Sequence, residues 1–383
     1  MAASLLDRIG PHAPVASGSS LSINNSDTSN TRNRPPRKRK RGQHNTDEGG
    51  QVWLTPWVNN IGMTEYESVT QRLHDEITAF VTYVGLTSQE EYMREQVRAL
   101  VHRILRNRFR RSEVNVFGSA AQGLSLPGGD VDIVLSLPHA DSRSELKTSL
   151  FQLAAMLKRT GVASDVEVRH QARIPIISFQ TVPELCTLRF DIGVNNEDGL
   201  KALPIVEKYM QDHPVLKPLM LVLKSFLSRR GLSSASNGGI NSFVLLCMVV
   251  SFIQLNPLNR PREDFTDFMQ RETLGVLLLG FFEYYGSRFP YLTSYISITE
   301  GRLLPKPSAP WISHPTTDRL VIQSPLDPER DCAKAASRIE QVKEAFREAK
   351  GILERITLPL RSNNHLGLII GLKQEVTASL FLR

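Results

Sequence analysis

The chain has 383 residues, of which 41% are hydrophobic and 22% charged, and its formal net charge at pH 7 is +7. This length and composition allow two packed domains with hydrophobic cores, which excludes a fibrous or wholly unstructured protein. The three cysteines lie far apart, with neither the paired spacing of a zinc site nor an even set for disulfides, so a reducing compartment is favoured. The longest apolar run, Phe243 to Ile253, is too short to cross a bilayer, so no membrane association is expected.

The first 50 residues are rich in Ser, Asn, Pro and Gly and are predicted to be a disordered basic tail, because they bury too little surface to offset the entropy of ordering. The tail carries +4 of the net charge, so the rest of the chain is only mildly basic. Residues 35–42 form a compact cluster, Pro-Pro-Arg-Lys-Arg-Lys-Arg-Gly, of the kind that a nuclear import receptor binds. The cluster predicts a nuclear location, with a solvated charge run or a nonspecific RNA-binding arm as alternatives.

Helical periodicity begins after Trp53, where apolar residues such as Leu73, Ile77 and Phe80 recur every three or four positions. Strand-like segments follow, and from residue 200 onward the pattern becomes almost wholly helical. The sequence therefore predicts an α+β fold with a small mixed sheet that has helices on one side. The predicted helices are 64–82, 88–110, 143–159, 200–211, 214–230, 240–255, 272–287 and 332–353, and the predicted strands are 114–117, 131–137, 166–170, 174–180 and 188–194.

Three aspartates stand on the polar faces of two predicted strands. In the first strand Val131, Ile133 and the following odd positions are apolar, so Asp130 and Asp132 would lie side by side on the other face. The run 188–195 repeats this alternation and places Asp191 on its polar face. If the two strands are adjacent, the three carboxylates converge in one cleft.

Carboxylate oxygens are the ligands that Mg²⁺ prefers, usually together with substrate phosphates. Two such ions can stabilise the attacking and the leaving oxygen of an in-line phosphoryl displacement. Asp130, Asp132 and Asp191 therefore predict nucleotidyl transfer with Mg²⁺, or with Mn²⁺ as the alternative ion. An isolated Asp-x-Asp is common by chance, but here Gly118-Ser119 forms a turn that could present backbone N–H groups and a hydroxyl to a triphosphate, and the stretch 126–129 (Leu-Pro-Gly-Gly) leads directly into the first strand.

A resemblance to a known family follows from motifs in the same order and spacing: Phe117-Gly-Ser119, Leu126-Pro-Gly-Gly-Asp-Val-Asp132, Arg189-Phe-Asp-Ile192, His213-Pro-Val-Leu-Lys-Pro-Leu219 and Asn237-Gly-Gly-Ile-Asn-Ser-Phe243. Together they resemble a TRAMP-type (topoisomerase-related, Cid-like) nuclear poly(A) RNA polymerase of the DNA polymerase beta-like nucleotidyltransferase superfamily. The likeness runs from about Trp53 to about Leu353. It implies a two-lobed fold, with a catalytic domain at 95–200 inserted into a helical central domain built from 51–94 and 201–355. Residues 356–383 would be a C-terminal extension of unknown role.

The resemblance also implies roles for individual residues. Asp130 and Asp132 would bind the metals, and Asp191 would complete the site and either accept the proton of the RNA 3′-hydroxyl or organise that group. The nucleotide, with ATP as the expected substrate, would contact Gly118, Ser119, Gly199, Lys224, Ser242, Phe243, Arg330 and Lys334. Periodicity alone leaves Lys224 open to being a snorkelling lysine and Phe243 to being a core residue.

Four positions depart from the family pattern. Arg330 and Lys334 stand where the family has asparagine and arginine, Asn241 stands where glycine is usual, and Phe243 where tyrosine is usual. They leave the choice of base open, because a guanidinium and an amide offer different donors and acceptors. A uridylyl- or mixed-nucleotide terminal transferase, an inactive nucleotidyltransferase-like scaffold and a transferase for small molecules or proteins are the alternatives.

The last expectations concern RNA and partners. Basic residues accumulate on one predicted helix and in the strand region, and they predict either RNA contact or a solvated helix face: Arg94, Arg98, Arg103, Arg106, Arg108, Arg110, Arg111, Arg169, His170 and Arg173. No zinc knuckle or aromatic RNA-binding motif is visible in the sequence. The resemblance therefore implies a zinc-knuckle RNA-binding protein and an RNA helicase as partners, in surveillance of nuclear RNA coupled to decay by the exosome.

Overall fold

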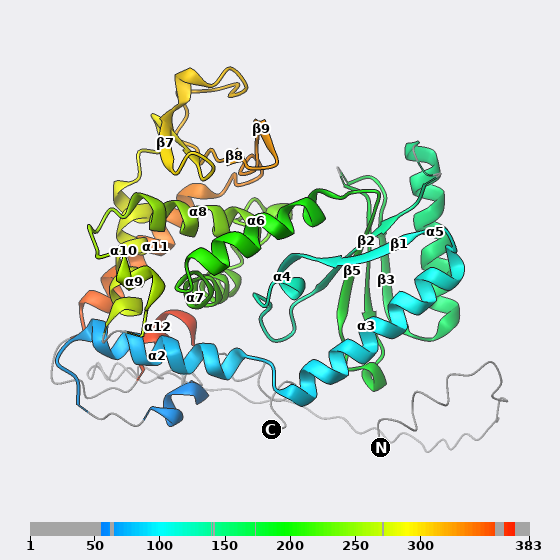
Figure 1. The fold of residues 1–383 in the computed structure, drawn as a ribbon, viewed down its shortest axis with the longest axis horizontal. Coiled ribbons are helices and arrows are strands. Elements are labelled where there is room, and N and C mark those ends of the chain that lie inside the picture. The colour runs from blue at the N-terminus through cyan, green and yellow to red at the C-terminus, as the bar shows by residue number, and fades with distance from the viewer. Residues whose placement is uncertain are drawn as a thin grey trace, which may run out of the picture. The chain divides into compact units, whose positions relative to one another are not determined.

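The structure is a computed structural model that describes residues 55–371, apart from 62–64, 139, 141, 173, 270–271 and 357–363 (Figure 1). The predicted tail at 1–50, its basic cluster at 35–42 and the end of the chain from 372 lie outside the described residues. In the part of the chain that is described, no helix combines the length and the apolar character needed to span a membrane.

Five strands form one mixed sheet in the order β1-β2-β5-β4-β3. The strands are β1 (Glu113–Phe117), β2 (Val131–Ser136), β3 (Ala163–Arg169), β4 (Ile176–Thr181) and β5 (Arg189–Val194). Strands β2 and β5 pair in parallel, and the other neighbours pair antiparallel. Helices α3 (Ser88–Arg108) and α5 (Arg143–Thr160) pack with the apolar face of the sheet into one core, which holds Val131, Ile133 and Phe190. Because alternate side chains of a strand face opposite sides, the polar residues between them lie on the other face.

Local signals fix where the two covering helices begin. Thr87 and Glu90 form a capping box at the start of α3, and Ser142 and Glu145 form one at the start of α5. Each box satisfies backbone N–H groups that a helix start leaves without partners. Helix α5 ends at Gly161, whose φ of 68° lies in the left-handed region that glycine adopts without strain.

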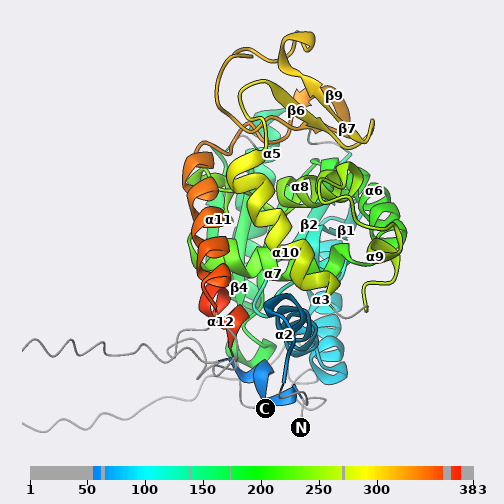
Figure 2. The same ribbon diagram turned by 90° about the vertical axis from the view of Figure 1, so that its left-hand side faces the viewer.

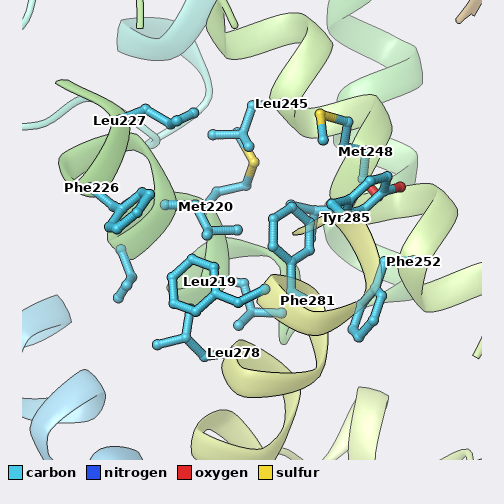
Figure 3. Close-up of a cluster of buried hydrophobic side chains, with 14 of the residues drawn as sticks. Leu219, Met220, Phe226, Leu227, Leu245, Met248, Phe252, Leu278, Phe281 and Tyr285 are labelled. Atoms are coloured by element: carbon cyan, nitrogen blue, oxygen red, sulfur yellow. The ribbon is translucent and has the colours of Figure 1, made fainter. Parts of the chain in front are cut away.

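A second and larger core lies among the helices. Figure 3 shows its centre, where Phe226, Leu245, Phe252 and Phe281 come from α7, α8 and α10. The helices of this lobe are α2 (Val69–Val84), α6 (Asp198–Asp212), α7 (Leu216–Arg229), α8 (Ser242–Leu255), α9 (Glu263–Thr266), α10 (Thr273–Glu283), α11 (Ile339–Glu354) and α12 (His365–Ile370). Helix α2 precedes the sheet in the chain but packs against α10, which follows it. The sheet lobe is therefore inserted into the helical lobe, and the predicted two-lobed α+β fold is confirmed.

The prediction of an almost wholly helical chain after residue 200 is wrong between 294 and 331. Two hairpins occur there, β6 (Ser294–Ser297) with β7 (Arg302–Pro305) and β8 (Gln323–Ser324) with β9 (Asp327–Asp331). Strands this short do not display a readable alternation of side chains. Strand β9 extends to Asp331, and α11 begins at Ile339 rather than at 332.

A buried lysine holds the segment between these hairpins together. The side chain of Lys306 has no exposed surface, and its Nζ donates to the backbone carbonyls of Tyr291 at 2.6 Å, Thr317 at 2.8 Å and Arg319 at 2.8 Å. An ammonium has three donors, so all of them are satisfied.

The short helix α12 docks on the helical lobe through a buried carboxylate. Glu76 of α2 is fully buried, pairs with Arg72 Nε at 2.7 Å, and accepts from the backbone N–H groups of His365 at 3.1 Å and Leu366 at 2.6 Å. It thus caps the start of α12, which lies next to α2 and the end of α11 in Figure 2. Leu366 and Ile369 are buried, so this part of the C-terminal extension belongs to the core.

Replacing Glu76 should therefore destabilise the whole helical lobe. Glu76→Ala removes the carboxylate that pairs with the buried Arg72 and uncaps α12, and removal of one member of a buried pair typically costs about 3 to 5 kcal/mol. Equilibrium urea unfolding of the variant should show a loss of this size. Glu65→Ala, which removes an exposed carboxylate near the same helix, is the control; a loss below about 1 kcal/mol for Glu76→Ala would contradict the assigned role.

Candidate active site

Asp132 and Asp191 face each other across the central parallel pair of strands. In the register of β2 and β5, Asp132 lies directly opposite Asp191, so both side chains project from the same face of the sheet. Asp130 lies immediately before β2 and is exposed, whereas Asp132 and Asp191 are half-buried. The structure thus brings the three predicted carboxylates together at the centre of the polar face.

The crowding of these charges shifts their titration. Burial, followed by the charges of Asp191 and Asp130, raises the pKa of Asp132 to about 7, against the lowering effect of Lys224. Although Asp130 is exposed as a residue, partial desolvation of its carboxyl group, together with the charge of Asp191, raises its pKa, while Arg189 and Arg169 oppose the rise. Because burial and like charges oppose the ionisation of these carboxylates, a bound cation would stabilise their charged forms.

Gly118 makes room for the Asp132 carboxylate. It links β1 to the single-turn helix α4 (Gly118–Ala121) with a φ of 69°, a left-handed conformation that favours glycine. A Cβ at this position would lie 2.3 Å from Oδ2 of Asp132, which is inside any permitted contact. The Gly-Ser turn is therefore packed directly against the second carboxylate.

Lys224 connects the helical lobe to the same turn. Its Nζ donates to the backbone oxygen of Leu124 at 2.6 Å, and the Leu124 N–H donates to the backbone oxygen of Ser119 at 3.0 Å. Burial lowers the pKa of Lys224 to about 8, and the charge of Asp132 opposes that change. The ammonium of α7 thus holds the loop that follows Ser119 and acts electrostatically on Asp132.

Two contacts, one of Gly199 and one of Asp198, position the start of α6. A Cβ on Gly199 would lie 2.1 Å from Cδ2 of Phe117, so close packing on that ring requires glycine here. Next to it, Asp198 accepts from Nη1 of Arg330 at 2.9 Å. The hairpin that carries Arg330 is therefore tied to α6, a contact that the sequence alone did not suggest.

The remaining predicted nucleotide contacts lie further out. Ser242 is exposed at the first position of α8, and Phe243 is half-buried against the helical core. Lys334 is exposed and lines, with Arg330, Trp311 and other residues, a hollow of about 170 Å³. Within the described residues, no hydrogen bond or ion pair joins any of the three to the carboxylates.

Asn241 has a structural role that sequence reasoning missed. Its Oδ1 accepts from the Val244 N–H at 2.9 Å and caps α8. Asparagine directly before an apolar run is a helix-start signal, and it could have identified this role.

The donor set suits a hard divalent cation. In the described part of the chain, none of the three carboxylates forms a hydrogen bond or an ion pair. No group of three or more His, Cys, Asp or Glu among the described residues forms a ready-made metal cage. Mg²⁺ commonly binds through one or two carboxylates together with waters and substrate phosphates, so the residues fit an ion that substrate helps to hold.

Comparison with known proteins identifies related family profiles. One family profile, "Poly(A) RNA polymerase, mitochondrial-like, central palm domain", matches residues 73–211, and another, "Cid1 family poly A polymerase", matches residues 273–330. Two profiles of poly(A) RNA polymerases thus match this chain, which confirms the resemblance drawn from its motifs.

Individual relatives agree with this assignment. Poly(A) RNA polymerase protein 1 of Saccharomyces cerevisiae is 31% identical over 301 residues, which are 78% of this chain and 46% of the relative. A Drosophila melanogaster protein, Trf4-2, described as an inactive poly(A) RNA polymerase, is 30% identical over 230 residues, 59% of this chain and 54% of the relative. The chain thus spans about half the length of the curated relatives it matches. A solved structure described as the polymerase core of TRAMP, an RNA surveillance complex, is 28% identical, has a TM-score of 0.72, and is matched over 82% of this chain and 98% of its own.

The raised pKa of Asp132 predicts how stability depends on pH. Between the unfolded value of 3.8 and the folded value of about 7, the folded protein binds more protons than the unfolded one, so the free energy of unfolding falls as pH rises through this window. Asp132→Asn removes this penalty. With EDTA present, the variant should melt about 3 °C above the parent at pH 8, and the gap should shrink toward pH 5.

Thermal melts at several pH values check this prediction. Asp165→Asn, which neutralises an exposed carboxylate of β3, serves as the matched control and should show no such trend. An equal gap for Asp132→Asn at pH 5 and pH 8 would contradict the electrostatic cause.

Proposed function

We propose that this chain is a polynucleotide adenylyltransferase that adds AMP from ATP to RNA 3′ ends. The observation that carries the proposal is the register of β2 and β5, which sets Asp132 beside Asp191 with Asp130 next to them on an accessible face. The matching poly(A) polymerase profile supports the same reaction class, as does the likeness to a polymerase core.

Each residue has a distinct task in this proposal. Asp130, Asp132 and Asp191 would hold divalent metal, with Mg²⁺ preferred over Mn²⁺. When bound, the metal would supply charge stabilisation for in-line attack of the RNA 3′-hydroxyl on the α-phosphorus of ATP, with pyrophosphate as the leaving group. Asp191, which lies opposite Ser178 of β4, would also orient the RNA 3′-hydroxyl. Lys224, with a pKa of about 8, is mostly protonated at neutral pH and would donate to the triphosphate near Ser119.

Asp132→Ala should abolish the transfer while leaving the fold intact. Loss of a central metal ligand is expected to lower the rate by about a thousandfold or more, since charge stabilisation is a dominant contribution in such reactions. The measurement is primer extension on a short RNA with each of the four NTPs, wild type beside variant, in Mg²⁺ and in Mn²⁺. Activity that is absent in both proteins would favour the inactive scaffold, the description that one relative carries.

The same assay decides the base. ATP is the preferred nucleotide under our proposal, and uridylyl or mixed transfer is the alternative, because Arg330 places a guanidinium near Gly199 through Asp198. Label that enters a small molecule or a protein but not RNA would exclude both readings.

Arg330→Ala tests whether the hairpin takes part in nucleotide binding. The pair with Asp198 is well exposed, so its loss should cost little stability. We expect the KM for ATP to rise about five- to tenfold, with kcat within about twofold, which corresponds to roughly 1 kcal/mol of binding. Arg302→Ala, which breaks the exposed pair with Glu300, is the control and should leave both constants unchanged; a fall in melting temperature with no change in KM would refute the binding role.

Partners and compartment follow from the similarity to known proteins rather than from the described residues. We propose a nuclear role in RNA surveillance, with a zinc-knuckle RNA-binding protein and an RNA helicase as partners, and import through residues 35–42. The similarity to a TRAMP polymerase core supports this assignment.

A further inference from the structure

A basic groove lies on the outer surface of the sheet lobe, away from the helical lobe. It has a volume of about 730 Å³ and is lined by Arg108 of α3 and by the outer face of α5, including Lys147, Phe151 and Arg159. No acidic residue lines it among the residues described. The groove therefore offers three cations and an aromatic ring with no negative charge between them.

The cations of this groove are available to a ligand. Lys147 and Arg159 are exposed, and within the described residues neither forms a hydrogen bond or an ion pair. Arg108 is held in place by a hydrogen bond from its Nη2 to Oε1 of Gln152 at 3.0 Å, which leaves its charge unpaired. Lys147 and Arg159 are twelve positions apart on one helix, so they stand about 18 Å apart along its axis.

Phe151 marks the rim between the groove and the sheet. Its side chain is 47% exposed, which is unusual for a phenylalanine, and its ring lies 5.5 Å from that of His170 at an interplanar angle of 51°. His170 directly follows Arg169 at the end of β3. Arg169 in turn is close enough to the site to lower the pKa of Asp130, against burial and Asp191. Phe151, His170 and Arg169 are thus successive neighbours from the groove to the sheet edge, where the Arg169 guanidinium also pairs with Glu167 at 2.7 Å.

We propose that this groove holds single-stranded RNA upstream of the 3′ end that lies at the carboxylates. The proposal rests on the proposed function, which supplies RNA as the substrate. Cations that track a phosphate backbone, together with an exposed ring on which a base stacks, are the elements of sequence-independent RNA binding. An acidic peptide could also bind these cations. It would not explain why the basic residues continue from the groove toward the carboxylates.

Adjacent residues on α5 provide a matched test. Arg159 lines the groove, and Lys158 beside it is exposed but does not. Fluorescence anisotropy with RNAs of about 6 and about 20 nucleotides, in EDTA and without nucleotide, should show a Kd for the long RNA raised about tenfold by Arg159→Glu and within about twofold of wild type for Lys158→Glu. We expect a smaller loss for the short RNA, because it cannot occupy the groove and the carboxylate site at once.

Two further measurements separate charge from stacking. Lys147→Glu with Arg159→Glu should reduce the dependence of log Kd on log salt by roughly 1.4, since each phosphate contact contributes about 0.7 for single strands. Phe151→Ala should weaken binding of the long RNA about fivefold without changing the salt dependence. Tyr92 is also an exposed ring but lies near the start of α3, whereas Arg108 of the groove is at its end, so Tyr92→Ala should have no effect.

The outcomes distinguish this proposal from the proposed function. Equal losses for Arg159→Glu and Lys158→Glu, or losses that do not depend on RNA length, overturn the groove as an RNA site, and unchanged RNA binding in all variants assigns it to a protein partner instead. If the wild type extends no primer but the length-dependent loss is seen, the groove stands and the proposed activity falls. If primers are extended and the groove variants bind RNA normally, the proposed activity stands and the groove is not an RNA site.

Discussion

The structure depends on holding two negative charges side by side on one sheet. Neighbouring strands are about 4.8 Å apart, so the register of β2 and β5 forces Asp132 and Asp191 into mutual repulsion. The surrounding parts accommodate this strain. Gly118 clears the space that the Asp132 carboxylate needs, and Lys224 brings a positive charge from the other lobe. The hydrophobic face of the same strands supplies the burial that keeps the arrangement folded.

The buried and polar faces of these strands and helices were predictable from the sequence, because they follow from the local periodicity of apolar residues. The alternation of Val131, Asp132 and Ile133 fixed both the buried face and the polar one, and the helical spacing in α2 and α3 fixed their cores. Contacts between distant segments were not predictable in this way. The Arg330–Asp198 pair joins positions 132 apart, and the packing of Gly199 on Phe117 depends on where α6 meets β1. The hairpins β6 to β9 were missed because such short strands acquire their conformation from their partners rather than from a pattern of their own.

Lys224 shows how the two lobes are coupled. It comes from α7, in the core of the helical lobe, and reaches the loop that follows the Gly-Ser turn. A displacement of one lobe relative to the other would therefore move the ammonium away from Leu124 and Asp132 together. The positive charge that opposes the raised pKa of Asp132 thus depends on how the two lobes are seated.

The triply coordinated Lys306 bears on how the neighbouring hairpins can vary. Its ammonium recognises main-chain oxygens of Tyr291, Thr317 and Arg319, so it does not read the identity of any side chain it holds. The three lysine contacts therefore persist whichever side chain stands at 317 or 319, whereas Tyr291 is also held by its own buried ring and hydroxyl. The course of the chain between the two hairpins thus rests on main-chain oxygens, a form of support that substitutions at the half-buried positions leave in place.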